Sequence, residues 1–207
     1  MARLPFIIAI SLVVITGRTI FPMILEMLVA VGFLAPQQSS TDATVKPIPV
    51  VPYEESWKCP DCSPQEKYVL AELQEHTKIS DRNALATIMG NIKQESNFHS
   101  NICEGGARIP YNTCDSGGYG LIQWTSVGRY DGLGKFCNKY GCDPSSLEGQ
   151  TRYMINENVF QRYLPMFEGG GQTVSQYMVP AYYWLGWGIK GNREIYAYEY
   201  TKKFVFS

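Results

Sequence analysis

Apolar side chains recur at helical spacing over most of the chain beyond residue 63. The two clearest stripes consist of Val69, Leu70, Leu73 and Thr77, and then of Leu85, Ile88, Met89 and Ile92. This i, i+3, i+4, i+7 spacing is typical of amphipathic helices that turn one face to a core. The same kind of pattern predicts further helices near 126–140, 146–162, 174–187 and 192–204. We therefore expect a mainly α domain with little or no sheet.

Polar residues at the ends of these stripes indicate where helices begin. A Ser or Thr stands three positions before a Glu or Gln in three places: Ser63 and Glu66, Ser145 and Glu148, Thr173 and Gln176. This is capping-box spacing, in which each side chain bonds the backbone N–H of the other residue. Pro180 falls inside the predicted helix 174–187 and is expected to kink or interrupt it. Residues 101–123, rich in Gly and polar side chains, predict loops and a small hairpin.

The first 35 residues differ from the rest because their only charges are Arg3, Arg18 and Glu26. The uncharged run Leu4–Gly17 is shorter than the roughly 20 residues that span a bilayer. Three interpretations stay open for 1–35: a signal peptide, a longer and imperfect membrane anchor, and an apolar plug inside a larger assembly. Residues 36–57 carry four prolines and predict an extended linker. Residues 58–207 are then the globular domain.

Composition narrows the functional classes. The chain has 18 Lys and Arg against 19 Asp and Glu, so it lacks the basic surface of a nucleic-acid-binding protein. Fourteen Tyr and four Trp are many for 207 residues. They suit a packed core, and they also suit a sugar-binding groove, because aromatic rings cover the apolar faces of pyranoses.

Six cysteines fall into three local couples, which favours the disulfides Cys59–Cys62, Cys103–Cys114 and Cys137–Cys142. The alternative is zinc, because Cys59 and Cys62 resemble half of a zinc knuckle. A four-ligand site needs a second half, and the nearest couple is wider and far along the chain. We expect disulfides, no metal and no cofactor. Oxidised cysteines fit a protein that works outside the cytosol.

Glu95 is the first candidate for chemistry. It lies three residues beyond Ile92, on the apolar face of its predicted helix. Partial desolvation favours the protonated form of a carboxyl group, and a general acid has to hold a proton near neutral pH. The alternative is a solvated glutamate that pairs with Lys93.

Two short motifs change the weight of these alternatives. They are Gly90-Asn91-Ile92-Lys93-Gln94-Glu95-Ser96 and Gly118-Tyr119-Gly120-Leu121-Ile122-Gln123-Trp124. Together they resemble the lysozyme-like superfamily of goose-type lysozymes and lytic transglycosylases, and most closely the phage tail lysozyme domain family. The resemblance is strong over residues 80–130, weaker over 145–204 and absent from 1–57. It implies a lysozyme-like fold and an enzyme that cuts the β-1,4 bond between N-acetylmuramic acid and N-acetylglucosamine in peptidoglycan.

The resemblance makes Glu95 the acid that protonates the leaving glycosidic oxygen. It also implies substrate-binding residues, which are Ser96, Gly118, Tyr119, Gly120, Gln123, Trp124 and Tyr183. The two glycines would let the backbone approach a sugar where a side chain would collide. Gln123 would bind a sugar hydroxyl or orient Glu95. The three aromatic rings would line the groove, with core packing as the alternative.

A second carboxylate is harder to place. Glycosidases commonly pair two, and Asp115 is our first candidate, ahead of Glu104 and Asp131. Lytic transglycosylases do without one, so hydrolysis and transglycosylation both stay open.

The expected partner is peptidoglycan. Phage tail or baseplate proteins, or a membrane reached through residues 1–35, are possible further partners. An enzyme of this kind would penetrate or lyse the host wall, either from a virion tail or as an exported, envelope-anchored protein. The alternative class is a structural virion component that keeps the fold and has weak or no activity.

Overall fold

A computed structural model describes residues 55–115 and 117–207 of the chain. The predicted segment 1–35 and the linker as far as residue 54 lie outside the described residues. Trp57, which the prediction placed at the end of the linker, already belongs to a strand of the folded domain. Within the described ranges, no helix is both long and apolar enough to cross a membrane.

The described residues form seven α-helices, one 3-10 turn and two very short strands. In chain order these are β1 Trp57–Lys58, α1 Pro64–His76, α2 Arg82–Ser96, η1 Tyr111–Thr113, α3 Val127–Tyr140, α4 Leu147–Asn156, α5 Asn158–Glu168, α6 Val174–Leu185, α7 Arg193–Lys203 and β2 Val205–Phe206. The two strands pair antiparallel, with Trp57 opposite Phe206. The expectation of a mainly α domain is confirmed.

Two of the three predicted capping boxes are confirmed, at Ser63 with Glu66 and at Thr173 with Gln176. The third is wrong by one residue. Ser146 caps α4 by accepting a hydrogen bond from the Gly149 N–H at 3.0 Å. Ser145 instead turns its hydroxyl toward the loop at Tyr111, whose N–H it accepts at 2.8 Å.

The predicted helix over 146–162 is also wrong, because the chain breaks at Glu157 into α4 and α5. Glu157 has an extended backbone, and its buried side chain turns inward to the half-buried Arg129. By contrast, α6 runs on through Pro180. Pro180 is buried, so its ring adds apolar contact in place of the hydrogen bond that its nitrogen cannot donate.

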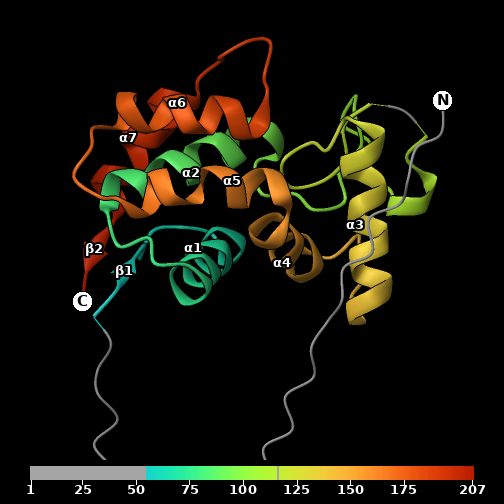
Figure 1. Ribbon diagram of the computed structural model, residues 1–207, viewed down its shortest axis with the longest axis horizontal. Coiled ribbons are helices and arrows are strands. Elements are labelled where there is room, and N and C mark those ends of the chain that lie inside the picture. Colours follow the sequence, from blue (N-terminus) through green and yellow to red (C-terminus); the bar gives the residue numbers. More distant parts are fainter. Residues whose placement is uncertain (1–54, 116) are drawn as a thin grey trace, which may run out of the picture. The chain divides into compact units, whose positions relative to one another are not determined.

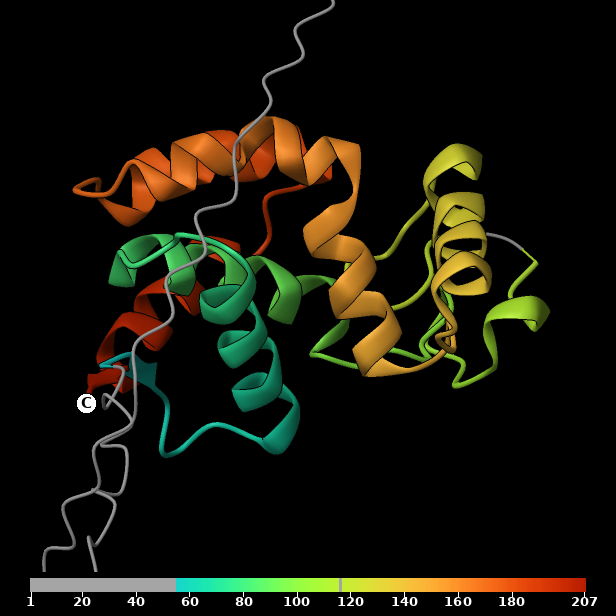
Figure 2. The ribbon, with the colours of Figure 1, turned by 60° about the horizontal axis from the view of Figure 1, so that its bottom comes forward.

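Figure 1 shows α2 at the centre of one group of helices, with α6 and α7 on one side and α1 on another. We call residues 55–99 and 157–207 the helical half. The loops and α3, residues 100–146, form the loop half, and α4 lies between the halves in both views (Figure 2).

Helix α2 is buried around its whole circumference from Ala84 to Ile92. Its neighbours include α7, which approaches closely because position 90 has no side chain. A Cβ at Gly90 would lie 2.5 Å from the Ala197 nitrogen and 2.7 Å from the Arg193 oxygen. Both distances are below contact, so Gly90 sets how closely the two helices pack.

Candidate active site

Glu95 lies in the last turn of α2, and 15% of its side chain is exposed. The partial burial expected from the apolar stripe is therefore found. Its carboxylate pairs with Arg193, the first residue of α7. Lys93, the alternative partner, instead contacts Glu199 at 3.5 Å.

The second motif forms a tight loop directly beside the end of α2. Tyr119 and Trp124 close it by exchanging backbone hydrogen bonds of 3.4 and 2.9 Å. The buried Ser96 hydroxyl donates to the Leu121 carbonyl oxygen at 2.7 Å. The residue that follows Glu95 therefore ties the two motifs together. Ser96 acts within the protein in this structure, as a local hydrogen-bonding residue.

From the other side, the same loop is held by Gln150 of α4, which is buried. Its Oε1 accepts the Leu121 N–H at 2.7 Å, and its amide donates to the carbonyls of Ser100 and Pro144 at 2.7 and 2.8 Å. Sequence reasoning missed Gln150, since nothing in the local pattern marks a residue whose partners lie about 30 to 50 positions away.

The two motif glycines make room for the protein's own side chains. Gly120 has φ +72°, and a Cβ there would lie 2.4 Å from Gln150 Oε1. A Cβ at Gly118 would lie 2.9 Å from the Cβ of Gln123. The two glycines were expected to let the backbone approach a sugar. In this structure they let it approach the side chains of Gln123 and Gln150.

Gln123, in the same loop, is half-buried and has a left-handed backbone, φ 52°. Its amide donates to the carbonyls of Gly120 and Ile102 at 3.0 and 3.3 Å. Its Oε1 accepts no hydrogen bond from residues 55–115 or 117–207 and is left for another donor.

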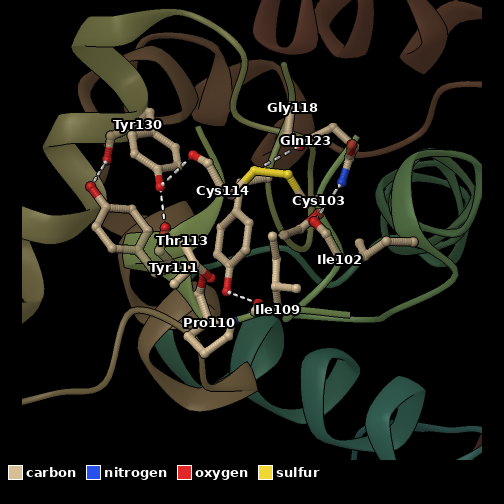
Figure 3. Close-up of a disulfide and its surroundings, with 12 residues drawn as sticks. Ile102, Cys103, Ile109, Pro110, Tyr111, Thr113, Cys114, Gly118, Gln123 and Tyr130 are labelled. Atoms are coloured by element: carbon tan, nitrogen blue, oxygen red, sulfur yellow. Dashed lines mark hydrogen bonds between the residues drawn. A yellow bond between two sulfur atoms is a disulfide. The ribbon is translucent and has the colours of Figure 1, made fainter. Parts of the chain in front are cut away.

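Tyr119 is completely buried, so the structure places it in the core and not along a groove. Its hydroxyl donates to the Ile109 carbonyl at 3.1 Å beside the Cys103–Cys114 disulfide (Figure 3). Tyr111 and Tyr130 stack at 4.3 Å, and each hydroxyl donates to the other residue's carbonyl. Burial raises the pKa of Tyr130 to about 12, so its hydroxyl remains a donor. We call this reciprocal pair the tyrosine clamp.

Trp124 is also completely buried. Its indole N–H donates to Glu157 at 3.3 Å, and the indole of Trp184 donates to the same carboxylate at 3.2 Å. Arg129 completes the set with a two-pronged contact to both Glu157 oxygens. Only 3% of the Glu157 side chain is exposed. This cluster joins the loop half to α6, and no local sequence pattern predicts it, because its members come from separate elements of the chain.

Tyr183 lies on the exposed face of α6, where 58% of its area is accessible. It stacks on Tyr163 at 5.8 Å and touches Tyr182, which is 46% exposed. Tyr182 contacts Trp187 at 5.3 Å, and Trp187 lies 4.7 Å from the Arg193 guanidinium. A row of aromatic rings therefore extends from the partner of Glu95 across α6, and we call it the aromatic row.

Asp115 is exposed and lies near Tyr130. No interaction joins it to Glu95 within the described residues. The two lower-ranked candidates are also at the surface: Glu104 lies over Gly117, and Asp131 is on α3. The second carboxylate stays a prediction.

The three predicted disulfides, Cys59–Cys62, Cys103–Cys114 and Cys137–Cys142, are confirmed, with Cα separations of 5.3, 5.7 and 4.4 Å. Cys59 and Cys62 are thus bonded to each other in this structure, as the preferred pairing predicts. Elsewhere, Glu72, Glu75 and His76 place three ligand-type atoms within 4.8 Å of one another. This group belongs to α1 and includes none of the predicted site residues.

Comparison with known proteins agrees with this geometry. Neither a curated protein nor a solved structure matches the chain. The family model described as phage tail lysozyme matches residues 64–178, which include Glu95, Ser96 and the whole glycine-containing loop. That match covers more than half of the chain and indicates a lysozyme-like, peptidoglycan-degrading role. The chain therefore belongs to the phage tail lysozyme family.

Proposed function

We propose that this protein cleaves the β-1,4 bond between N-acetylmuramic acid and N-acetylglucosamine in peptidoglycan, with Glu95 as the general acid. The observation that carries the proposal is the Ser96–Leu121 hydrogen bond of 2.7 Å. It fixes the glycine-containing loop against the residue next to the acid, so both parts of the family motif meet at one place. Glu95 is partly exposed there, as a residue that receives substrate has to be.

In this mechanism the Glu95 carboxyl group gives its proton to the glycosidic oxygen while the bond from that oxygen to the anomeric carbon breaks. Gln123 Oε1 has no hydrogen-bond donor within the described residues and would accept a hydrogen bond from a sugar hydroxyl. Either water or the substrate's own 6-hydroxyl then attacks the anomeric carbon and gives its proton to the Glu95 carboxylate, which restores the acid. The first route leaves a reducing end, and the second leaves an anhydro sugar.

The decisive test is Glu95→Gln in the full-length chain. The variant should keep its helical circular dichroism and lose about 10²–10⁴-fold in rate on purified peptidoglycan. Glu199→Gln, on the neighbouring helix, removes another partly exposed carboxylate and should leave the rate unchanged. Mass analysis of the products then identifies the route. A wild-type protein without activity on several bacterial walls would support the structural virion component instead.

The aromatic row supports a second part of this proposal, that Tyr183 binds the glycan strand. Tyr182 and Tyr183 are exposed, and the row continues through Trp187 to Arg193. Tyr183→Ala should raise KM by about tenfold, because a stacked ring contributes about 1 kcal/mol beyond its buried area, and should change kcat little. Tyr140→Ala, an equally exposed tyrosine at the end of α3, is the matched control. An unchanged KM in Tyr183→Ala would remove this residue from the site.

We further propose that residues 1–35 place the enzyme and take no part in catalysis. All residues with a proposed chemical role lie between 95 and 193, and the chain divides into units 1–50 and 51–207. Deletion of residues 1–50 should leave the rate on wall fragments nearly unchanged. Loss of cleavage in a truncated but folded protein contradicts this separation. Finding the full-length chain in intact particles would indicate a virion protein, and its absence would indicate an exported lysis protein.

A further inference from the structure

Arg193 is an unusual residue to find next to a catalytic acid, because its side chain is only 7% exposed. Arginine is almost never buried without partners. Its Nη1 donates to the carbonyls of Ile189 and Lys190, both at 2.8 Å, and its guanidinium lies 4.7 Å from the centre of the Trp187 ring. The loop between α6 and α7 therefore fixes the guanidinium independently of Glu95.

The contact between Arg193 and Glu95 uses only half of each group. Nη2 donates to Oε1, whereas an arginine fork commonly donates to both oxygens of a carboxylate. The Nε–H of Arg193 is buried and has no acceptor within the described residues. Oε2 of Glu95 accepts no hydrogen bond from residues 55–115 or 117–207. One oxygen of the acid is held, and the other is left open.

Several other charged groups near α2 have partners of their own. On α7, Glu194 pairs with Lys190 and Glu199 pairs with Lys93. Helix α6 has no charged residue. On α1, Glu66 is bonded to Ser63 and Tyr200, and on α5, Glu168 accepts from the Lys78 N–H. None of the charged side chains of α1 or α5 contacts Glu95 among residues 55–115 and 117–207, so Arg193 is the charge that faces the acid.

Gly90 explains how Arg193 reaches this place. The close packing of α2 on α7 at Gly90 brings the Arg193 backbone against α2, one and a half helical turns before Glu95. The first glycine of the family motif thus positions a residue that lies beyond the matched range, which ends at residue 178.

We propose that Arg193 is a positioning residue for Glu95. Arg193 holds Oε1 of Glu95 and leaves Oε2 of Glu95 to carry the proton. The inference rests on the proposed function of Glu95. As the proton moves from Oε2 to the glycosidic oxygen, Glu95 becomes an anion, and Arg193 stabilises that negative charge through Oε1. The fixed guanidinium needs no reorganisation at that moment, because the loop already holds it.

The test compares two variants in the full-length chain. Arg193→Gln removes the charge and should lower kcat about 100-fold with little change in KM. The pH at which activity falls on the alkaline side should rise in this variant, because ionised Glu95 has lost its counter-ion. Arg193→Lys loses the guanidinium contacts, so it should lower kcat. It keeps the positive charge, so the alkaline limit should stay in place. Lys190→Met, which removes an exposed cation of the same loop, should change neither quantity.

A merely structural role would lower the melting temperature of Arg193→Gln and leave the alkaline limit where it is. That outcome, in an enzyme that Glu95→Gln inactivates, overturns the positioning role while the proposed function stands. If Arg193→Gln does not fold, the melting temperature of Glu95→Gln provides a second test. It should melt below the wild-type protein at neutral pH, because Arg193 loses its charged partner, and the difference should shrink as the pH falls. Equal melting temperatures throughout, or a difference that does not change with pH, also overturn the proposal.

Discussion

The helical half and the loop half both border the proposed site, but they are held together by different kinds of contact. In the helical half, α2 is buried around its circumference by neighbouring helices. Between residues 100 and 126 the described part of the loop half has little regular structure. It is held by isolated β-bridges, one disulfide, the tyrosine clamp and the hydrogen bonds from Ser96 and Gln150, in addition to its own buried side chains. Apolar packing spreads stability over many side chains, whereas each of these specific contacts depends on one or two groups. Substitutions at those groups should therefore have the larger effects on the site.

The largest effect should come from the buried cluster that joins the halves. Glu157→Gln leaves Arg129 without a counter-charge and should destabilise the domain by about 3 kcal/mol. Its matched control is Glu148→Gln, which breaks an exposed pair with Arg152 and should change stability little. Urea denaturation of both variants measures the difference. Equal stabilities would mean that the halves are not held together by this cluster.

Loss of the Cys103–Cys114 disulfide should cost nearly as much, about 3 kcal/mol in the chain-entropy treatment of an 11-residue separation. In the double serine variant, amide exchange should accelerate in residues 101–124 and stay slow in α2. The corresponding variant of Cys137 and Cys142 should leave residues 101–124 protected. Uniform acceleration across both halves would show that the disulfide stabilises the whole domain.

Gly120→Ala tests the contact of the loop with Gln150. The new Cβ combines a left-handed backbone with a close approach of 2.4 Å to Gln150 Oε1, so we expect a loss of about 2 kcal/mol. Gly141→Ala has a similar φ, +69°, but nothing within 4 Å, and should cost about 1 kcal/mol. Thermal melts of the pair separate backbone strain from crowding. Equal losses would leave crowding without a role.

The smallest expected effect lies in the helical half and depends on pH. Burial alone would raise the pKa of Glu66, but hydrogen bonds from Tyr200 and Ser63 lower it below the ordinary 4.5. The ionised carboxylate therefore stabilises the fold above pH 4.5 by about 1 kcal/mol, and this contribution is lost as the pH falls through the lower pKa of the folded state. The melting temperature of Glu66→Gln should be below wild type at neutral pH and converge with it in acid. A constant difference over that range contradicts the assignment.

The same contrast explains what the sequence could predict. Periodicity and capping residues are local, so the bounds of α3, α6 and α7 were predicted within about two residues, and α1 and α2 were located by their apolar stripes. The motif also located Glu95 and the loop around Gly120. Arg193, Gln150 and Glu157 were missed because their partners lie far along the chain, and no local pattern encodes such distances. Tyr119 and Trp124 were predicted to line a groove, but a motif does not say which way a ring points, and both are buried.

The pairing of β1 with β2 has a consequence for how this domain can be combined with others. Ser56 and Ser207 exchange backbone hydrogen bonds of 3.0 and 3.1 Å, so the polypeptide enters and leaves the folded unit at one place. A unit with adjacent ends can be inserted into a surface loop of another protein, or have its ends joined and new ones opened elsewhere, without disturbing its interior. The architecture thus suits insertion of the whole domain into another polypeptide, with the surroundings of Glu95 unchanged.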